Sequence, residues 1–324
     1  MRKMFMFPSA MVAVSAAMFW PGQTELGTVA HAGKWGPSTT VHFGYIVPAL
    51  PAGAPAEGDY YPVRNKETIQ RTFDLGASGR AIDIDNVDGA IEVTGTDSNQ
   101  VTLTIEKTIY AENEALSGDA RRDVKLDVTH EGGRLKLFVD GPFRCWCGNN
   151  DRRSVNFRGD LGYRVEMNFK LQVPRDSDVR LSTVNNGDIR VRDVRGQFSV
   201  SNVNGSIQMQ GIAGAGKAHT VNGEVKVTFR ENPRAESSFK SVNGDIDLYF
   251  VRGLSADFRF KTFNGDVYTD FAVTALPQRG MERVTKGSKT ILRSDRYTSG
   301  RVGAGGVEIR TENLNGDIRI RETQ

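Results

Sequence analysis

The chain has 324 residues, a length that allows about one to three domains. Its 42 Lys and Arg residues nearly balance 39 Asp and Glu residues, and this near-neutrality gives no reason to expect a nucleic-acid partner. With 35 glycines, 11 prolines and 4 histidines, the composition is typical of a chain rich in turns.

The first 32 residues have the order of a secretory signal peptide. Arg2 and Lys3 precede an apolar run at 4–20, and the small residues of VAHAG offer a cleavage site after Ala32. The run is shorter than the ~20 apolar residues that cross a bilayer, although a retained N-terminal anchor stays open as an alternative. No later segment is predicted to span a membrane. We therefore expect an exported, soluble protein of the periplasm, the outer cell surface or the extracellular space.

Two segments of different composition follow. Residues 33–65 are rich in Gly, Pro and Ala without a sustained period, which predicts a linker. Residues 66–175 alternate apolar and polar side chains, which predicts a β-rich N-terminal segment. Within it, AENEALSGDARR (111–122) predicts one short helix, and EGGR (131–134) predicts a hairpin turn.

The two cysteines of the chain, Cys145 and Cys147, lie in a predicted loop at 141–162. Export favours a disulfide, but a bridge across one residue closes a small, strained ring and adds little stability. A redox or intermolecular role stays open. Zinc usually takes four ligands, and no further Cys or His cluster supplies them, so we expect neither a metal nor another cofactor. No catalytic constellation is recognised either.

From residue 176 to residue 324 the chain repeats one phrase, as in TVNGEVKVTF (220–229) and SVNGDIDLYF (241–250), and an earlier copy lies at 86–95. Repeats of this length are typical of coils that bury an apolar face only by stacking on one another. We therefore predict an all-β fold, a β-solenoid with a period of about 18–21 residues, preceded by the β-rich segment. The repeat glycines are Gly89, Gly187, Gly205, Gly223, Gly244, Gly265 and Gly316; the Asx residues before them are Asp88, Asn186, Asn204, Asn222, Asn243, Asn264 and Asn315.

Asn-Gly between apolar residues usually signals a hairpin, but here a hairpin would pair apolar with polar residues. Strict alternation fits better, with Val242 and Gly244 on the inward face and Ser241 and Asn243 on the other. The glycine then occupies an inward bend, the polar residues align into ladders, and the last copy forms a capping coil. Only the copy that begins at Thr183 needs a bulge, for its extra Asn.

The residue after each repeat glycine is acidic in most copies. Such a column suggests calcium, but the glycine-rich pattern of calcium-binding β-rolls is missing and Ser206 interrupts the column. Basic residues two positions further on, Arg190, Lys226 and Arg319, offer ion-pair partners instead.

The segment 272–305 is a basic excursion between two copies of the phrase. It is either a solvated loop or a contact surface for an anionic envelope polymer. The residues assigned to that contact are Arg279, Arg283, Lys286, Lys289, Arg293, Arg296 and Arg301.

Three stretches carry a family resemblance: RTFDLGASGRAIDIDNVDGAIEV (71–93), FKLQVPRDSDVRLSTVNNGDIRV (169–191), and the serial TVNGEV and SVNGDI units. Over residues 66–324 the chain resembles the bacterial "putative adhesin" family of β-strand-repeat proteins, whose members have no established activity. The resemblance implies an exported all-β protein of the cell envelope. The cysteine loop and the basic excursion depart from the usual pattern of that family.

These observations favour a non-enzymatic envelope or surface protein that adheres or scaffolds through a long β face. Its expected partner is an anionic envelope polymer, a surface glycan or another envelope protein. A module that senses envelope stress or antimicrobial peptides is the alternative, and a polysaccharide-cleaving enzyme is less favoured.

Overall fold

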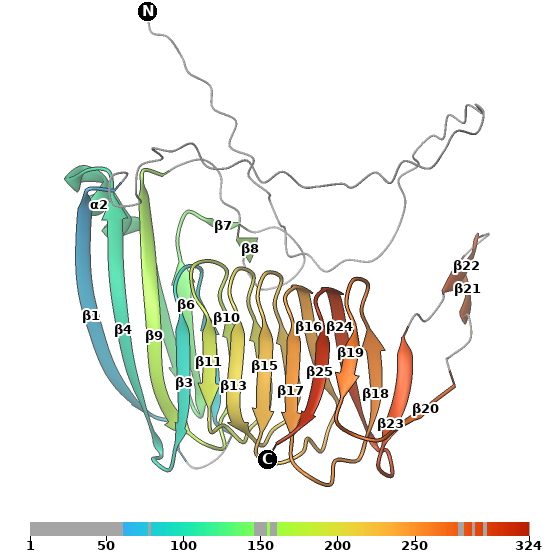
Figure 1. Cartoon of the computed structure of the whole chain (residues 1–324). Helices are drawn as coiled ribbons and strands as arrows, with labels where there is room; N and C mark the ends of the chain where they lie inside the picture. Colours follow the sequence, from blue (N-terminus) through green and yellow to red (C-terminus); the bar gives the residue numbers. More distant parts are fainter. Residues whose placement is uncertain are drawn as a thin grey trace, which may run out of the picture.

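The computed structural model describes residues 61–76, 79–145, 154–155, 161–277, 282–286, 289–293 and 297–323. These residues form an all-β structure with one helix, built from a ten-stranded sheet, here sheet A, and an eleven-stranded sheet, here sheet B. The two sheets lie face to face and enclose the core between them (Figure 1). The all-β prediction is confirmed.

Most strands come in pairs that form one coil each, the first strand in sheet B and the second in sheet A. In chain order the pairs are β2 (Ala81–Asp85) with β3 (Ile91–Thr96), β10 (Asp178–Ser182) with β11 (Ile189–Arg192), β12 (Phe198–Ser201) with β13 (Ile207–Ile212), β14 (Gly216–His219) with β15 (Val225–Phe229), β16 (Ser237–Asn243) with β17 (Ile246–Phe250), β18 (Ala256–Lys261) with β19 (Val267–Thr269), and β24 (Val307–Asn315) with β25 (Ile318–Glu322). Neighbouring coils pair in parallel and in register, so equivalent residues of successive coils lie side by side.

Longer strands close the N-terminal end of the stack. In sheet A, β1 (Val63–Asp74), β4 (Gln100–Ala111) and β9 (Tyr163–Pro174) run antiparallel, and β9 pairs in parallel with β3. In sheet B, the hairpin of β5 (Lys125–Glu131) and β6 (Arg134–Asp140) pairs with β2. The helix α2 (Glu114–Asp123) joins β4 to β5. The predicted helix and the predicted hairpin turn are both confirmed.

Local chemistry explains the ends of these elements. The Asn113 side chain accepts a hydrogen bond of 3.0 Å from the Leu116 amide and so caps the first turn of α2. Strand β1 begins at Val63, inside the stretch 33–65 for which a linker is predicted, because it pairs along its whole length with β4. The coil β2–β3 stacks directly on β10–β11, so one stack runs across the predicted boundary at 175/176.

The core is a set of columns, each made of the same inward position in successive coils. Ile91, Ile189, Ile207, Val225, Ile246 and Ile318 form one such column and are fully buried. The equivalent residue of the last stacked coil, Val267, is 38% exposed, since β19 is the final strand of sheet A in the described chain. Burial therefore depends on a neighbouring coil on each side, as expected for repeats that cannot fold alone.

The order of coils in space differs from their order in the chain. Strand β25 lies between β17 and β19, and β24 lies between β16 and β18 (Figure 1). After β17 the chain leaves one coil position open and forms β18 and β19 beyond it. It then returns through β20 (Val273–Ala275) and β23 (Thr298–Val302), which pair antiparallel in sheet B, and β24 and β25 fill the open position. The prediction that the last copy caps the stack is therefore wrong. In the interior position, the apolar residues of β24 and β25 are covered by a neighbouring coil on each side.

The repeated phrase forms the corner between the two sheets. The strands on either side of Asn243-Gly244 belong to different sheets, so the rejection of a hairpin is confirmed. The predicted alternation is wrong at the corner, however: Ser241 is 5% exposed and points inward, whereas Val242 is half-buried. The chain turns between sheets at this point, and the turn reverses the expected faces.

Two smaller strand pairs lie beside the stack: β7 (Arg144–Cys145) with β8 (Ser154–Val155), and β21 (Glu282–Lys286) with β22 (Lys289–Arg293). The latter hairpin projects beyond the end of the sheets that β19, β20 and β23 form (Figure 1). Among the described residues, no helix has the length and apolar character required to cross a membrane.

Candidate functional site

The inward polar residues of the corner hold adjacent coils together. Each donates a hydrogen bond to the carbonyl oxygen of the repeat glycine one coil away, as Ser241 Oγ does to Gly223 at 2.9 Å. The equivalent donors are Thr183 to Gly89, Asn202 to Gly187, Thr220 to Gly205, Asn313 to Gly244 and Thr262 to Gly316. The sequence predicted a ladder of these residues among themselves, and the structure instead has each one satisfy a buried backbone carbonyl.

Close backbone approach explains the glycines. A Cβ atom at Gly244 would collide with the Gly223 carbonyl oxygen, and one at Gly223 would collide with that of Gly205. Gly244 also has φ +142°, a conformation that side-chain-bearing residues rarely adopt. The repeat glycines are thus required by the spacing of the coils.

The Asx residues before the glycines form a side-chain ladder on the outside of the corner. In the spatial order 185, 204, 222, 243, 315 and 264, each Nδ2 donates to the Oδ1 of the preceding Asn at 2.7–2.9 Å. The predicted ladder is present, but Asn185 occupies the position assigned to Asn186. Asn186 is the bulged residue, with φ +52°, which explains how the extra Asn is accommodated. The corresponding backbone bridge at the first coil is Asp88 to Asn185.

The residues after the glycines form a second ladder. The side-chain oxygen of Asp188 accepts from the Ser206 amide at 2.9 Å, and Asp317 accepts from the Asp266 amide at 3.1 Å. Asp245 likewise accepts from the Asp317 amide at 2.9 Å. The side-chain oxygens of this column therefore accept hydrogen bonds from backbone amides of the adjacent coil. Within the described part of the chain, no group of three or more His, Cys, Asp or Glu is arranged to hold a metal.

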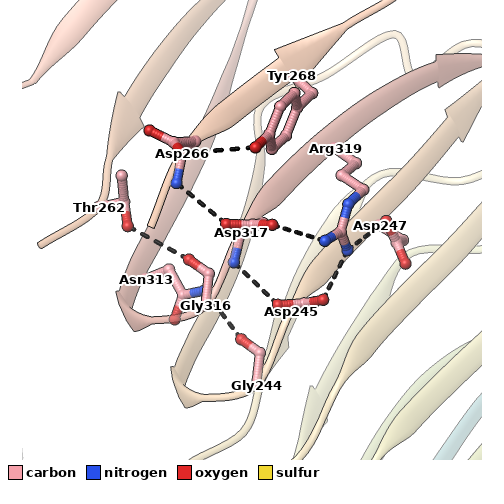
Figure 2. A network of polar contacts seen from close by, with 10 residues as sticks. All are labelled: Gly244, Asp245, Asp247, Thr262, Asp266, Tyr268, Asn313, Gly316, Asp317 and Arg319. Carbon is pink, nitrogen blue, oxygen red and sulfur yellow. Dashed lines mark hydrogen bonds and ion pairs between the residues drawn. The ribbon is translucent and has the colours of Figure 1, made fainter. Parts of the chain in front are cut away.

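Arg319 neutralises this acidic column at the C-terminal coils. Its guanidinium lies 2.6 Å from both Asp245 and Asp317, and 3.7 Å from Asp247 (Figure 2). The bond from Arg319 lowers the pKa of Asp245, and the same contact raises the pKa of Arg319. The predicted pairing with the acid two residues earlier is present for Arg319 and Arg190, at 2.6 Å and 2.7 Å. The same prediction for Lys226 is wrong, since among the described residues its ammonium makes no ion pair with Glu224.

The outer face of sheet A carries two further rows of side chains, three and five residues after each glycine. The five-residue row places Arg192, Gln210, Thr228, Tyr249 and Arg321 directly beside one another. A depression of about 290 Å³ lies over β11, β13 and β15 on this face. Its lining includes Arg192, Gln208, Gln210, Glu224, Lys226 and Thr228.

A carboxyl group also lines this depression. Burial, together with the adjacent Asp247 carboxylate to which protonated Glu224 can donate, raises the pKa of Glu224. Asp247 itself is only 9% exposed. The pair therefore resists carrying two full charges, which weakens the negative potential at this part of the face.

The outer face of sheet B anchors the end of the basic excursion. The Tyr297 ring lies 4.5 Å from the Arg259 guanidinium and 5.6 Å from that of Arg310, and its hydroxyl donates to Glu312. Burial and the bond to Glu312 raise the pKa of Tyr297. Arg301, predicted as a ligand contact, is instead paired with Asp257 at 2.7 Å. This part of the excursion is packed into the fold.

The other predicted contacts of the excursion stay predictions. Arg279 and Arg296 lie outside the described residues. Arg283, Lys286, Lys289 and Arg293 lie on β21 and β22, for which the backbone alone is described. Cys147 also lies outside the described residues, and Cys145 is placed by its backbone in β7, so the disulfide stays a prediction. The adjacent Arg144 is anchored to Asp85 at 3.0 Å.

The sequence reasoning missed the row that contains Arg192, Tyr249 and Arg321. Their common position, five residues after a repeat glycine, was a usable signal, because every second residue after the corner points outward. It missed Tyr297 as well, and no regular spacing marks that residue.

Known proteins provide a family match. Residues 176–321 match the model of the Toastrack DUF4097 family, which confirms the resemblance over that part of the chain. No curated protein matches the chain.

Several solved structures resemble the chain at low identity. A putative cell adhesion protein from Clostridium sporogenes is 8% identical, covers 80% of this chain and 100% of its own, and has a TM-score of 0.39. A putative adhesin from Bacteroides fragilis is 14% identical, with 79% and 97% coverage and a TM-score of 0.34. A putative lipid binding protein from Parabacteroides distasonis is 14% identical, with 80% and 97% coverage and a TM-score of 0.27.

Proposed function

With residues 176–321 forming a Toastrack DUF4097 domain, we propose that the protein is an exported, non-enzymatic protein of the bacterial envelope or surface, and that its β-solenoid is a scaffold for adhesion. One observation carries this proposal: parallel, in-register coils present a single continuous polar face on sheet A. Such a face offers outward side chains at regular intervals, which suits contact with an extended partner.

The internal polar groups support a structural role for the repeated phrase. The asparagines, the inward donors and the acids after the glycines are engaged with one another or with backbone groups. Each such bond contributes about 1 kcal/mol to stability. The phrase therefore explains the scaffold, and the partner must be recognised by the outward rows.

A polysaccharide-cleaving activity receives less support. Glycosidases generally place two carboxyl groups about 5 Å or more apart across the scissile bond. Glu224, which lines the depression on sheet A, instead lies close enough to Asp247 for one carboxyl group to donate to the other. This arrangement leaves no room for a sugar between them.

Fractionation of the native host, with N-terminal sequencing and protease shaving of intact cells, tests the proposal. A chain that begins at Gly33 and is removed from whole cells supports a surface role. A shaving-resistant periplasmic chain excludes adhesion and leaves scaffolding within the envelope, whereas a cytoplasmic chain refutes the proposal. Release of reducing sugar from any member of a panel of acidic polysaccharides would refute the non-enzymatic part.

A further inference from the structure

Three exposed cations stand out on the outer face of sheet A. Arg192, Lys226 and Arg321 make no ion pair with any described residue, whereas Arg190 and Arg319 on the same face are paired with carboxylates. Cations that make no ion pair and share one face attract an anionic partner more strongly than paired cations do.

The three cations lie on every second strand. Arg192 is on β11, Lys226 on β15 and Arg321 on β25, with β13 and β17 between them. Because neighbouring strands lie about 4.8 Å apart, the cations repeat at intervals of about 10 Å across the strands. The whole row from Arg192 to Arg321 spans about 19 Å.

The Tyr249 ring contacts two of the three cations, Lys226 and Arg321. By sequence position, Lys226 belongs to the neighbouring row, but its Nζ lies 5.6 Å from the centre of the Tyr249 ring. The Arg321 guanidinium lies 5.8 Å from the same ring. These cation–π contacts hold both charged groups near the row that contains Arg192, and they leave the polar hydrogens of the cations available.

Neutral hydrogen-bonding groups fill the intervals. Gln208 and Gln210 on β13 are exposed, and Thr228 on β15 is half-buried beside them. Amide and hydroxyl groups of this kind donate to and accept from sugar hydroxyls. Glu224 is the carboxyl group in the lining of the depression, and its raised pKa limits its repulsion of an anion.

From this arrangement we infer that the row Arg192–Lys226–Arg321 binds a linear glycan with one carboxylate per disaccharide, lying across the strands of sheet A. The spacing of about 10 Å matches an extended disaccharide, so successive carboxylates meet successive cations while the neutral sugars lie over Gln208, Gln210 and Tyr249. This inference rests on the proposed function, since it names the partner of the same face. A partner with an anion on every sugar would leave alternate charges without a cation.

Calorimetric titration of the purified full-length protein tests the inference. The probes are a hyaluronan octasaccharide with one carboxylate per disaccharide, an octamer of polygalacturonate with one on every sugar, and neutral chitooctaose. We expect the hyaluronan octasaccharide to bind best and chitooctaose to bind worst. Arg192→Gln and Arg321→Gln should each weaken hyaluronan binding about tenfold, equivalent to about 1.4 kcal/mol. Higher salt should weaken it further.

Arg180→Gln provides the matched control. Arg180 is exposed on β10, in sheet B, and makes no ion pair with a described residue, so its loss changes net charge equally but on the opposite face. Unchanged hyaluronan binding by this variant supports the inference. Equal loss in all three variants, equal binding of polygalacturonate, or no binding of hyaluronan overturns it.

The shaving experiment separates the two proposals. If the protein is exposed on the surface but does not bind hyaluronan, the glycan site is refuted and the scaffold proposal stands. A cytoplasmic protein that binds hyaluronan through Arg192 and Arg321 refutes the surface role and retains the site.

Discussion

Replacing Gly244 with alanine tests the claim that coil spacing dictates the repeat glycines. The new methyl group would collide with the Gly223 carbonyl oxygen of the adjacent coil. Relieving such overpacking typically costs about 1–3 kcal/mol. The φ of +142° adds about 1–3 kcal/mol of backbone strain. We therefore expect Gly244→Ala to lose roughly 2–6 kcal/mol of unfolding free energy.

Gly253→Ala isolates the backbone contribution. Gly253 also has a positive φ, +82°, but a Cβ atom there would meet nothing within 4 Å. This control should lose only about 1–3 kcal/mol. Urea unfolding followed by far-UV circular dichroism measures both losses. If Gly244→Ala is no less stable than Gly253→Ala, close approach of the coils does not explain the glycine.

Three further variants test the inserted coil and the charged groups. Ile320 is buried in the coil that lies between β17 and β19, so Ile320→Ala should lose about 2–5 kcal/mol of unfolding free energy, measured in urea. Leu314 lies in the same coil but is 45% exposed, so Leu314→Ala should lose under about 1 kcal/mol. Equal losses would contradict the interior position. Burial, together with the nearby lysines Lys240 and Lys217, lowers the pKa of His219 to about 4 in the folded protein. As the pH falls, the histidine is therefore protonated in the unfolded chain before the folded one. The free energy of unfolding should decrease by about 1.4 kcal/mol per pH unit from about pH 6.5 towards 4. His219→Gln should reduce this slope in urea midpoints, and parallel curves for both proteins would refute the assignment. Arg319→Met removes the cation that lowers the pKa of Asp245 from 3.8, so it should cost about 1–2 kcal/mol at pH 7. The cost should shrink as the pH falls below 3.8 and through the lowered pKa of Asp245; a loss independent of pH would point to packing instead.

The repeat pattern predicted much of the architecture and part of the site. Period, alternation and the absence of a hairpin at Asn243-Gly244 followed from residue order alone. The predicted Asn ladder is present as well, because identical residues in register must lie beside each other. The predicted basic contact stays a prediction: Arg301 is exposed and paired with Asp257, and the side chains of the other residues assigned to it are not described.

The predicted inward and outward faces were wrong at the corner for a geometric reason. Alternation predicts faces only while a strand continues straight. Between Ser241 and Gly244 the chain leaves one sheet and enters the other, so Ser241 turns inward and its hydroxyl reaches the carbonyl of Gly223. The same argument applies to Asn185 and Asn186, since a bulge shifts the register by one residue.

The sequence by itself determined the unit of this protein: a coil of about 20 residues with a glycine at its corner, an apolar inner side and polar ladders outside. Only the tertiary structure decided which coil neighbours which. The coils are so alike that each can pair with any other, and placing β24–β25 between β16–β17 and β18–β19 gives its apolar residues a neighbour on both flanks. That arrangement also brings Arg321 beside Tyr249 and completes the row that begins at Arg192. Residues 72 positions apart in the chain thereby become adjacent in space, which no local pattern specifies.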